Sequence, residues 1–81
     1  MMANERQFLL EYQEEGGNFY YNSMDEHHHP NTSGYRTIAI CSFNECCDFS
    51  QAMNEKYDFG KRPYPTYDCI LEEWQLLKRN Q

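Results

Sequence analysis

The ten residues CSFNECCDFS, at positions 41–50, mark the point where this sequence changes from strand-like to helical. The stretch YRTIAICS, residues 35–42, overlaps their start and contains the β-branched residues typical of strands. Ser42 is followed three residues later by Glu45, the spacing of a capping box, in which each side chain binds a backbone N–H group at the start of a helix. The stretch therefore predicts a strand that ends near Cys41 and a helix that begins after Ser42.

Two helices are predicted in the second half of the chain. In the first, apolar side chains recur every three or four residues, at Cys46, Phe49, Met53 and Tyr57, and Gly60 is expected to end it. The segment KRPYPTY, residues 61–67, contains two prolines and is predicted as a linker or short edge strand. Thr66 is the expected N-cap of the last helix, whose apolar face comprises Tyr67, Ile70, Leu71, Trp74 and Leu77.

The first half predicts a helix and a hairpin. ANERQFLLEYQEEGG, residues 3–17, is predicted as a helix with Phe8, Leu9 and Tyr12 on one face and two glycines at its end. NFYYNS, residues 18–23, is expected to pair with residues 35–42 across a long polar loop. The order α-β-β-α-α predicts one small α+β domain, residues 1–81, with about three helices packed on one face of a small antiparallel sheet.

Charge and composition narrow the function classes. The 81 residues carry a net charge of -6, and residues 1–60 contain ten acids and three bases. An acidic surface repels phosphate backbones, so we expect no direct nucleic-acid binding and a basic protein surface as the natural partner. Seven Tyr, five Phe and one Trp supply the large rings that help a small core to close.

Targeting signals are not expected in this sequence. No stretch approaches the ~20 apolar residues of a membrane span. The N-terminal MMANERQFLLEYQEE lacks the basic start and apolar core of a signal peptide. We therefore expect a cytoplasmic protein with reduced thiols and no membrane partner.

The four cysteines allow a structural and a chemical interpretation. The spacing of Cys41, Cys46, Cys47 and Cys69 does not match the paired ligands of a zinc site, so we favour buried, structural cysteines, Cys46 and Cys69 above all. Cys41, between a strand and a helix N-terminus, is the candidate reactive thiol, because that position can lower a thiol pKa. A metal- or thiol-dependent protein that uses these cysteines and the His27–His29 loop remains the alternative.

The histidine run His27–His29 lies in the predicted loop beside Asp25 and Glu26. These residues could bind a transition metal adventitiously or act as a pH-sensitive contact, but a solvated loop tip is the favoured interpretation. No catalytic set and no Gly-rich phosphate loop is present. We therefore predict no enzyme activity, no metal site and no cofactor.

Acidic side chains offer a possible binding surface. Asn44, Asp48, Gln51, Glu55 and Asp58 form a polar stripe opposite the apolar one, and we expect Glu11, Glu14 and Glu15 on the first helix to add to it. Tyr20, Tyr21 and Tyr64 are candidate aromatic anchors of an interface.

These features predict a small protein-binding module that occupies a basic surface of a nucleic-acid-handling protein, by nucleic-acid mimicry or simple charge complementarity. Phage anti-defence proteins, anti-CRISPR inhibitors among them, are of this kind. The other alternative is a structural subunit or a homodimer without an inhibitory role.

Overall fold

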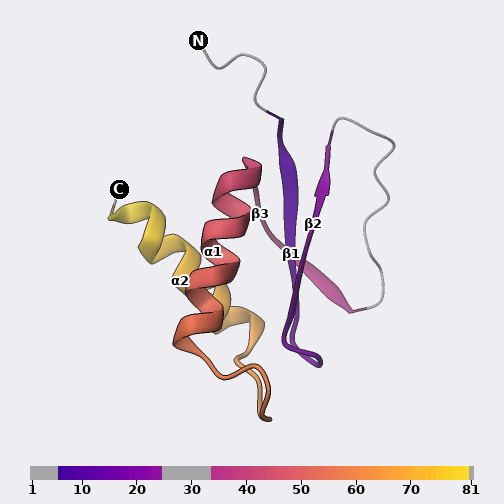
Figure 1. The fold of residues 1–81 in the computed structure, drawn as a ribbon, viewed down its shortest axis with the longest axis vertical. Coiled ribbons are helices and arrows are strands. Elements are labelled where there is room, and N and C mark those ends of the chain that lie inside the picture. Colours follow the sequence, from indigo (N-terminus) through magenta and orange to yellow (C-terminus); the bar gives the residue numbers. More distant parts are fainter. Residues whose placement is uncertain (1–5, 25–33, 81) are drawn as a thin grey trace.

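The computed structural model describes residues 6–24 and 34–80. Its elements are β1 (Phe8–Gln13), β2 (Asn18–Ser23), β3 (Tyr35–Cys41), α1 (Phe43–Lys56) and α2 (Tyr67–Arg79). The strands form an antiparallel sheet of order β2-β1-β3, and both helices lie on the same side of it (Figure 1). The α+β class is thus confirmed. The predicted order α-β-β-α-α with about three helices is wrong, because the described elements run β-β-β-α-α.

The error lies in the first segment, where residues predicted as helix form the central strand β1. Leu10 and Tyr12 face the helices, whereas Leu9 and Glu11 alternate to the opposite side of the sheet, and all four are buried. Because both faces of β1 are buried, its apolar residues do not alternate strictly with polar ones, and their spacing also fits one face of a helix.

The two glycines after β1 form a turn of a β-hairpin and do not end a helix. Residues 14–17 connect β1 to β2, and Gly17 has a φ of 63°, which favours glycine. A Cβ atom at Gly17 would lie 2.7 Å from the Tyr64 ring and 2.9 Å from the Phe59 ring. The turn therefore packs closely against the segment between the helices, which only a residue without a side chain permits.

The predicted hairpin between residues 18–23 and 35–42 is also wrong, because each of these strands pairs with β1 instead. Leu10 lies opposite Tyr21 on one side and Ala39 on the other. Leu10 pairs with Ala39 and Glu11 with Thr37, so Ile38 is the extra residue of a β-bulge. Ile38 is only 8% exposed and belongs to the core on the helical side of the sheet.

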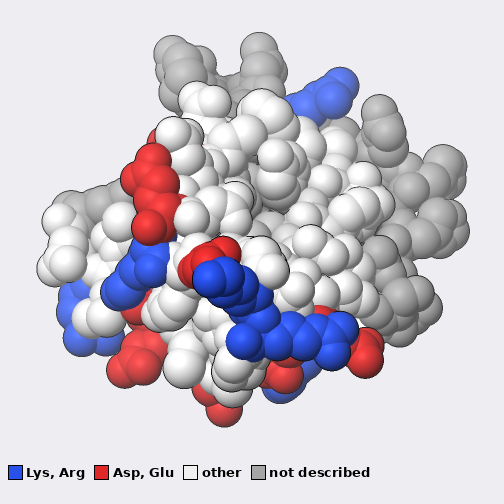
Figure 2. Space-filling model, turned by 60° about the horizontal axis from the view of Figure 1, so that its bottom comes forward, with Lys and Arg blue, Asp and Glu red and all other residues white. Residues whose placement is uncertain are grey.

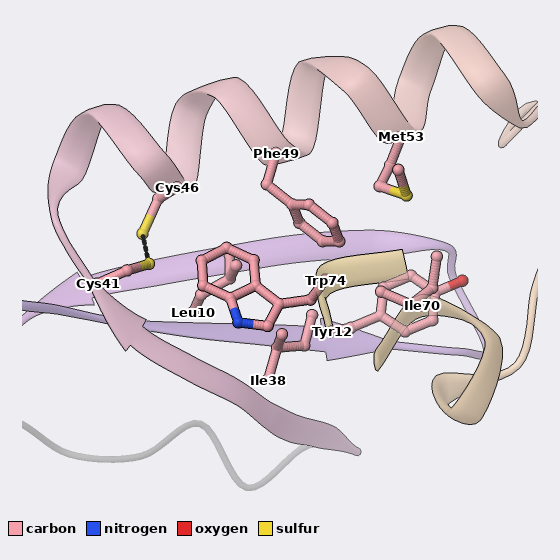
Figure 3. Packing of buried hydrophobic residues seen from close by; sticks show 9 residues of the cluster. All are labelled: Leu10, Tyr12, Ile38, Cys41, Cys46, Phe49, Met53, Ile70 and Trp74. Carbon is pink, nitrogen blue, oxygen red and sulfur yellow. Dashed lines mark hydrogen bonds between the residues drawn. The ribbon is translucent and has the colours of Figure 1, made fainter. Parts of the chain in front are cut away.

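The core lies between the sheet and the helices (Figure 3). Phe49 of α1 meets Trp74 of α2 edge to face, with ring centroids 5.2 Å apart, and meets Phe19 of β2 at 5.9 Å. Both predicted N-caps are confirmed: Ser42 and Glu45 form the capping box, and Thr66 caps α2. The first of these helices ends at Lys56, four residues before Gly60, because Tyr57 is extended.

Within the described residues, neither helix has the length and apolar character that a bilayer crossing requires.

Candidate functional site

The acidic stripe predicted on the first helix of the second half lies on the solvent side of α1. Asn44, Asp48, Gln51 and Glu55 are exposed, and Asp58, just beyond the helix, is exposed as well. Cys46, Phe49 and Met53 face the core on the opposite side. At 1.5 Å per residue, Asp48 and Glu55 lie about 10 Å apart along the helix axis.

Salt bridges neutralise other acids near this surface but not these two. Glu45 pairs with Lys78, and Glu73 pairs with Lys56 at 2.5 Å. The hydrogen bond from each lysine lowers the pKa of the glutamate that it contacts. Asp48 and Glu55 make no ion pair with any residue that the structure describes, so their charges are available to a partner.

The three acids expected beside this stripe are not displayed on a helix. Glu11 lies in the central strand and is 2% exposed. Glu14 accepts a hydrogen bond from the backbone N–H of Tyr67 at the start of α2, where a negative charge also complements the helix dipole. Glu14 and Glu15 are both exposed in the β1–β2 turn. The prediction that a first helix presents all three is therefore wrong.

The three candidate tyrosines lie in three different places. Tyr20 is 38% exposed, with its ring centroid 5.6 Å from that of Tyr35. Tyr21 is half-buried and lies 3.7 Å from the Cys47 sulfur; this hydrogen bond raises the pKa of the Tyr21 hydroxyl. Tyr64 is half-buried and stacks on Phe59, with centroids 6.5 Å apart. They therefore do not form one continuous aromatic surface.

A groove of about 580 Å³ lies at the end of the acidic stripe, between the C-terminus of α1 and the N-terminus of α2. Its lining residues come from the segment that joins the two helices and from the first turn of α2: Tyr57, Asp58, Lys61, Pro63, Tyr64, Pro65, Thr66 and Cys69. The sequence pattern predicts a binding role for Asp58 and Tyr64, but it does not predict that they share one concave surface. The proline and tyrosine content of residues 61–67 was the one signal that pointed to an irregular, aromatic segment here.

Two long-range hydrogen bonds and one local hydrogen bond shape this groove. The Tyr12 hydroxyl of β1 donates to the Pro65 carbonyl at 2.7 Å. The Tyr57 hydroxyl donates to the Glu73 carboxylate at 3.0 Å, and the backbone N–H of Gly60 donates to Asp58 at 2.9 Å. The segment between the helices is thus attached to β1 and to α2, so the groove has a defined shape.

This end of the molecule carries charges of both signs. Figure 2, which brings the lower end of Figure 1 forward, shows basic side chains directly beside acidic ones. Lys61 and Arg62 lie in the segment next to the groove and are exposed. Acidic and basic side chains are therefore mixed at this end of the molecule.

The cysteines do not converge on one point. Cys41 and Cys46 are buried with their sulfurs 3.1 Å apart, whereas Cys47 lies beside Tyr21. Cys69 is exposed, so the prediction that it is a buried structural cysteine is wrong; Ile70 and Trp74 take the inward face of α2 instead.

Burial raises the pKa of both the Cys41 and the Cys46 thiols, and it does so at Cys41 despite the nearby helix N-terminus. The described residues contain no group of three or more potential metal ligands. His27–His29, with Asp25 and Glu26, lie outside the residues that the structure describes.

Comparison of the chain with known protein families, curated proteins and solved structures gave no match.

Proposed function

We propose that this chain is a small cytoplasmic binding protein that occupies a basic surface of a nucleic-acid-handling protein, in the manner of a phage anti-defence inhibitor. The observation that supports this most directly is the exposed face of α1. Asp48 and Glu55 lie on it with no ion pair among the described residues, and it leads through Asp58 to the aromatic groove. A charged stripe beside a concave aromatic surface combines long-range attraction with a place for close packing.

The spacing of the acidic side chains on α1 distinguishes mimicry of duplex DNA from simple charge complementarity with a basic partner. Duplex DNA carries one charge per about 1.7 Å of axis, which is roughly six charges over 10 Å. Over the same length, α1 presents the two charges of Asp48 and Glu55. The stripe therefore has the sign of a phosphate backbone but about a third of its charge density. We infer that the charges mainly speed and orient the encounter, while close contacts at the groove supply much of the affinity.

The test begins with affinity capture from the native host and identification of the bound protein by mass spectrometry. Association is then measured with the purified partner at low and at physiological salt. The test variant is Asp48→Lys with Glu55→Lys, since both side chains are exposed in the middle of α1. Asp58 is left unchanged, because it accepts a hydrogen bond from the Gly60 backbone and its loss would disturb the groove.

A matched control places three lysines at exposed positions of α2 beyond its first turn and at its C-cap, Glu72→Lys with Gln75→Lys and Asn80→Lys, and so changes the net charge equally. We expect the α1 variant to associate about tenfold more slowly or worse at low salt, with the difference shrinking as salt is added. The control should keep most of the wild-type rate, and both variants should keep the wild-type circular dichroism spectrum. Equal effects of the two variants, or a partner that binds no nucleic acid, would contradict the proposal.

A further inference from the structure

Two thiols face each other beneath the first turn of α1. Cys41 is the last residue of β3 and Cys46 is the fourth residue of α1; their exposed fractions are 4% and 0%. Figure 3 shows both sulfurs pointing toward one another across the space between strand and helix. The residues between them are held by the capping box of Ser42 and Glu45, so the approach is part of the ordered strand-to-helix connection.

The distance between these sulfurs is short for two thiols. The two Sγ atoms are 3.1 Å apart. Non-bonded carbon atoms rest at about 3.5–4.0 Å, and sulfur is the larger atom. A disulfide bond is about 2.05 Å long, so the bond would form by a movement of about 1 Å.

We propose that Cys41 and Cys46 are a disulfide-forming site, which a peroxide oxidises to an intramolecular bond that joins β3 to α1. One thiolate attacks a peroxide oxygen; the O–O bond breaks, and a sulfenic acid and, after protonation, water are formed. The second thiol then attacks the sulfenic sulfur; the S–S bond forms, the S–O bond breaks, and the leaving hydroxyl takes the thiol proton as water. In total two thiols and one hydrogen peroxide give one disulfide and two molecules of water.

Burial determines how this reaction starts. It raises the pKa of both thiols, but a hydrogen bond from the Cys46 thiol partly offsets this at Cys41. Cys41, which is also the more accessible of the two, is therefore the first to be oxidised, and Cys46 completes the bond. Because oxidant must reach a nearly closed site, the reaction requires local opening of the first turn of α1 and is slow in native buffer.

The bond would tie the start of the helix that carries the acidic stripe to the sheet. It closes a short loop, residues 41–46, and restricts the unfolded chain. For a domain of this size we expect the oxidised protein to melt on the order of 10 °C higher than the reduced one. This inference does not depend on the proposed binding function.

The experiment uses the full chain with Cys47→Ser and Cys69→Ser, which leaves the pair as the only thiols. The protein is treated with hydrogen peroxide in native buffer and in mild urea, and followed by intact mass and peptide mapping. We expect loss of two hydrogen atoms, a Cys41–Cys46 cross-link, faster reaction in mild urea, and a higher melting temperature that a reductant reverses. The control adds Cys41→Ala, which keeps a small apolar side chain and should show neither the cross-link nor the shift in melting temperature.

Three results would overturn the proposal. The first is oxidation of the pair to sulfinic acid without a cross-link. The second is no reaction in either buffer. The third is a cross-linked protein that melts below the reduced one, since that would show a bond the native fold does not accommodate.

Discussion

Replacing Tyr12 by Phe removes one hydroxyl group that links the central strand to the groove. The Tyr12 ring is fully buried, and its hydroxyl donates to the Pro65 carbonyl at 2.7 Å, across 53 residues of sequence. Tyr12→Phe keeps the ring contacts with Phe19 and Phe59, at centroid distances of 4.9 and 6.2 Å. The change therefore isolates the hydrogen bond from the packing.

The expected cost follows from the burial of this bond. Loss of a hydrogen bond that leaves a part-buried carbonyl without its donor costs about 1–2 kcal/mol of unfolding free energy. A chain of this length has a total stability of roughly 4–12 kcal/mol, so the loss is a sizeable fraction. We expect the melting temperature to fall by roughly 5–15 °C.

A second consequence of Tyr12 appears at high pH. Burial, and to a lesser degree the charge of Glu14, raises the pKa of the Tyr12 hydroxyl from 10.0 to about 12. Between these values the unfolded chain loses the proton while the folded chain keeps it. The folded state then binds more protons, and stability falls as the pH rises from 10 to 12. Tyr12→Phe lacks this group, so its stability should fall less steeply over that range.

The assay is urea unfolding followed by the fluorescence of Trp74, the single tryptophan of the chain, at pH 7 and at pH values from 9 to 12. Tyr20→Phe, on a ring that is 38% exposed, is the matched control and should cost little. The reasoning is refuted if Tyr12→Phe is as stable as the control at pH 7 and also shows the wild-type alkaline slope.

Two further substitutions test the core and the helix start. Phe49→Ala should lower the free energy of unfolding by about 3–5 kcal/mol, because the side chain is fully buried against Trp74 and its removal leaves a cavity. Phe49→Leu fills most of that space and should lower it clearly less. Equal losses for the two variants in urea unfolding would show that the cavity is not the cause. Ser42→Ala should lower the free energy of unfolding by about 1 kcal/mol and Ser42→Gly by only a few tenths, because alanine fits an N-cap poorly. If Ser42→Ala were as stable as the wild type, the capping role would be contradicted.

Local signals in the sequence predicted the helical half of the molecule well. The capping box at Ser42, the N-cap at Thr66 and the apolar stripe of Cys46, Phe49 and Met53 all involve residues within a few positions of one another. A helix satisfies its backbone within the same segment, so such patterns determine it directly. The exposure of Asp48 and Glu55 follows from the same periodicity, since they lie opposite the buried stripe.

The tertiary structure decided what depends on distant partners. Residues 8–13 became a strand because β2 and β3 pair with the two edges of β1, and the six residues FLLEYQ by themselves fit either structure. Tyr12 and Pro65 meet to shape the groove only because the sheet and helices pack as they do. Ile70 is buried and its neighbour Cys69 is exposed because the sheet covers the face of α2 that carries Ile70. Sequence spacing along one element determines which residues share a face, but packing between elements determines which faces meet.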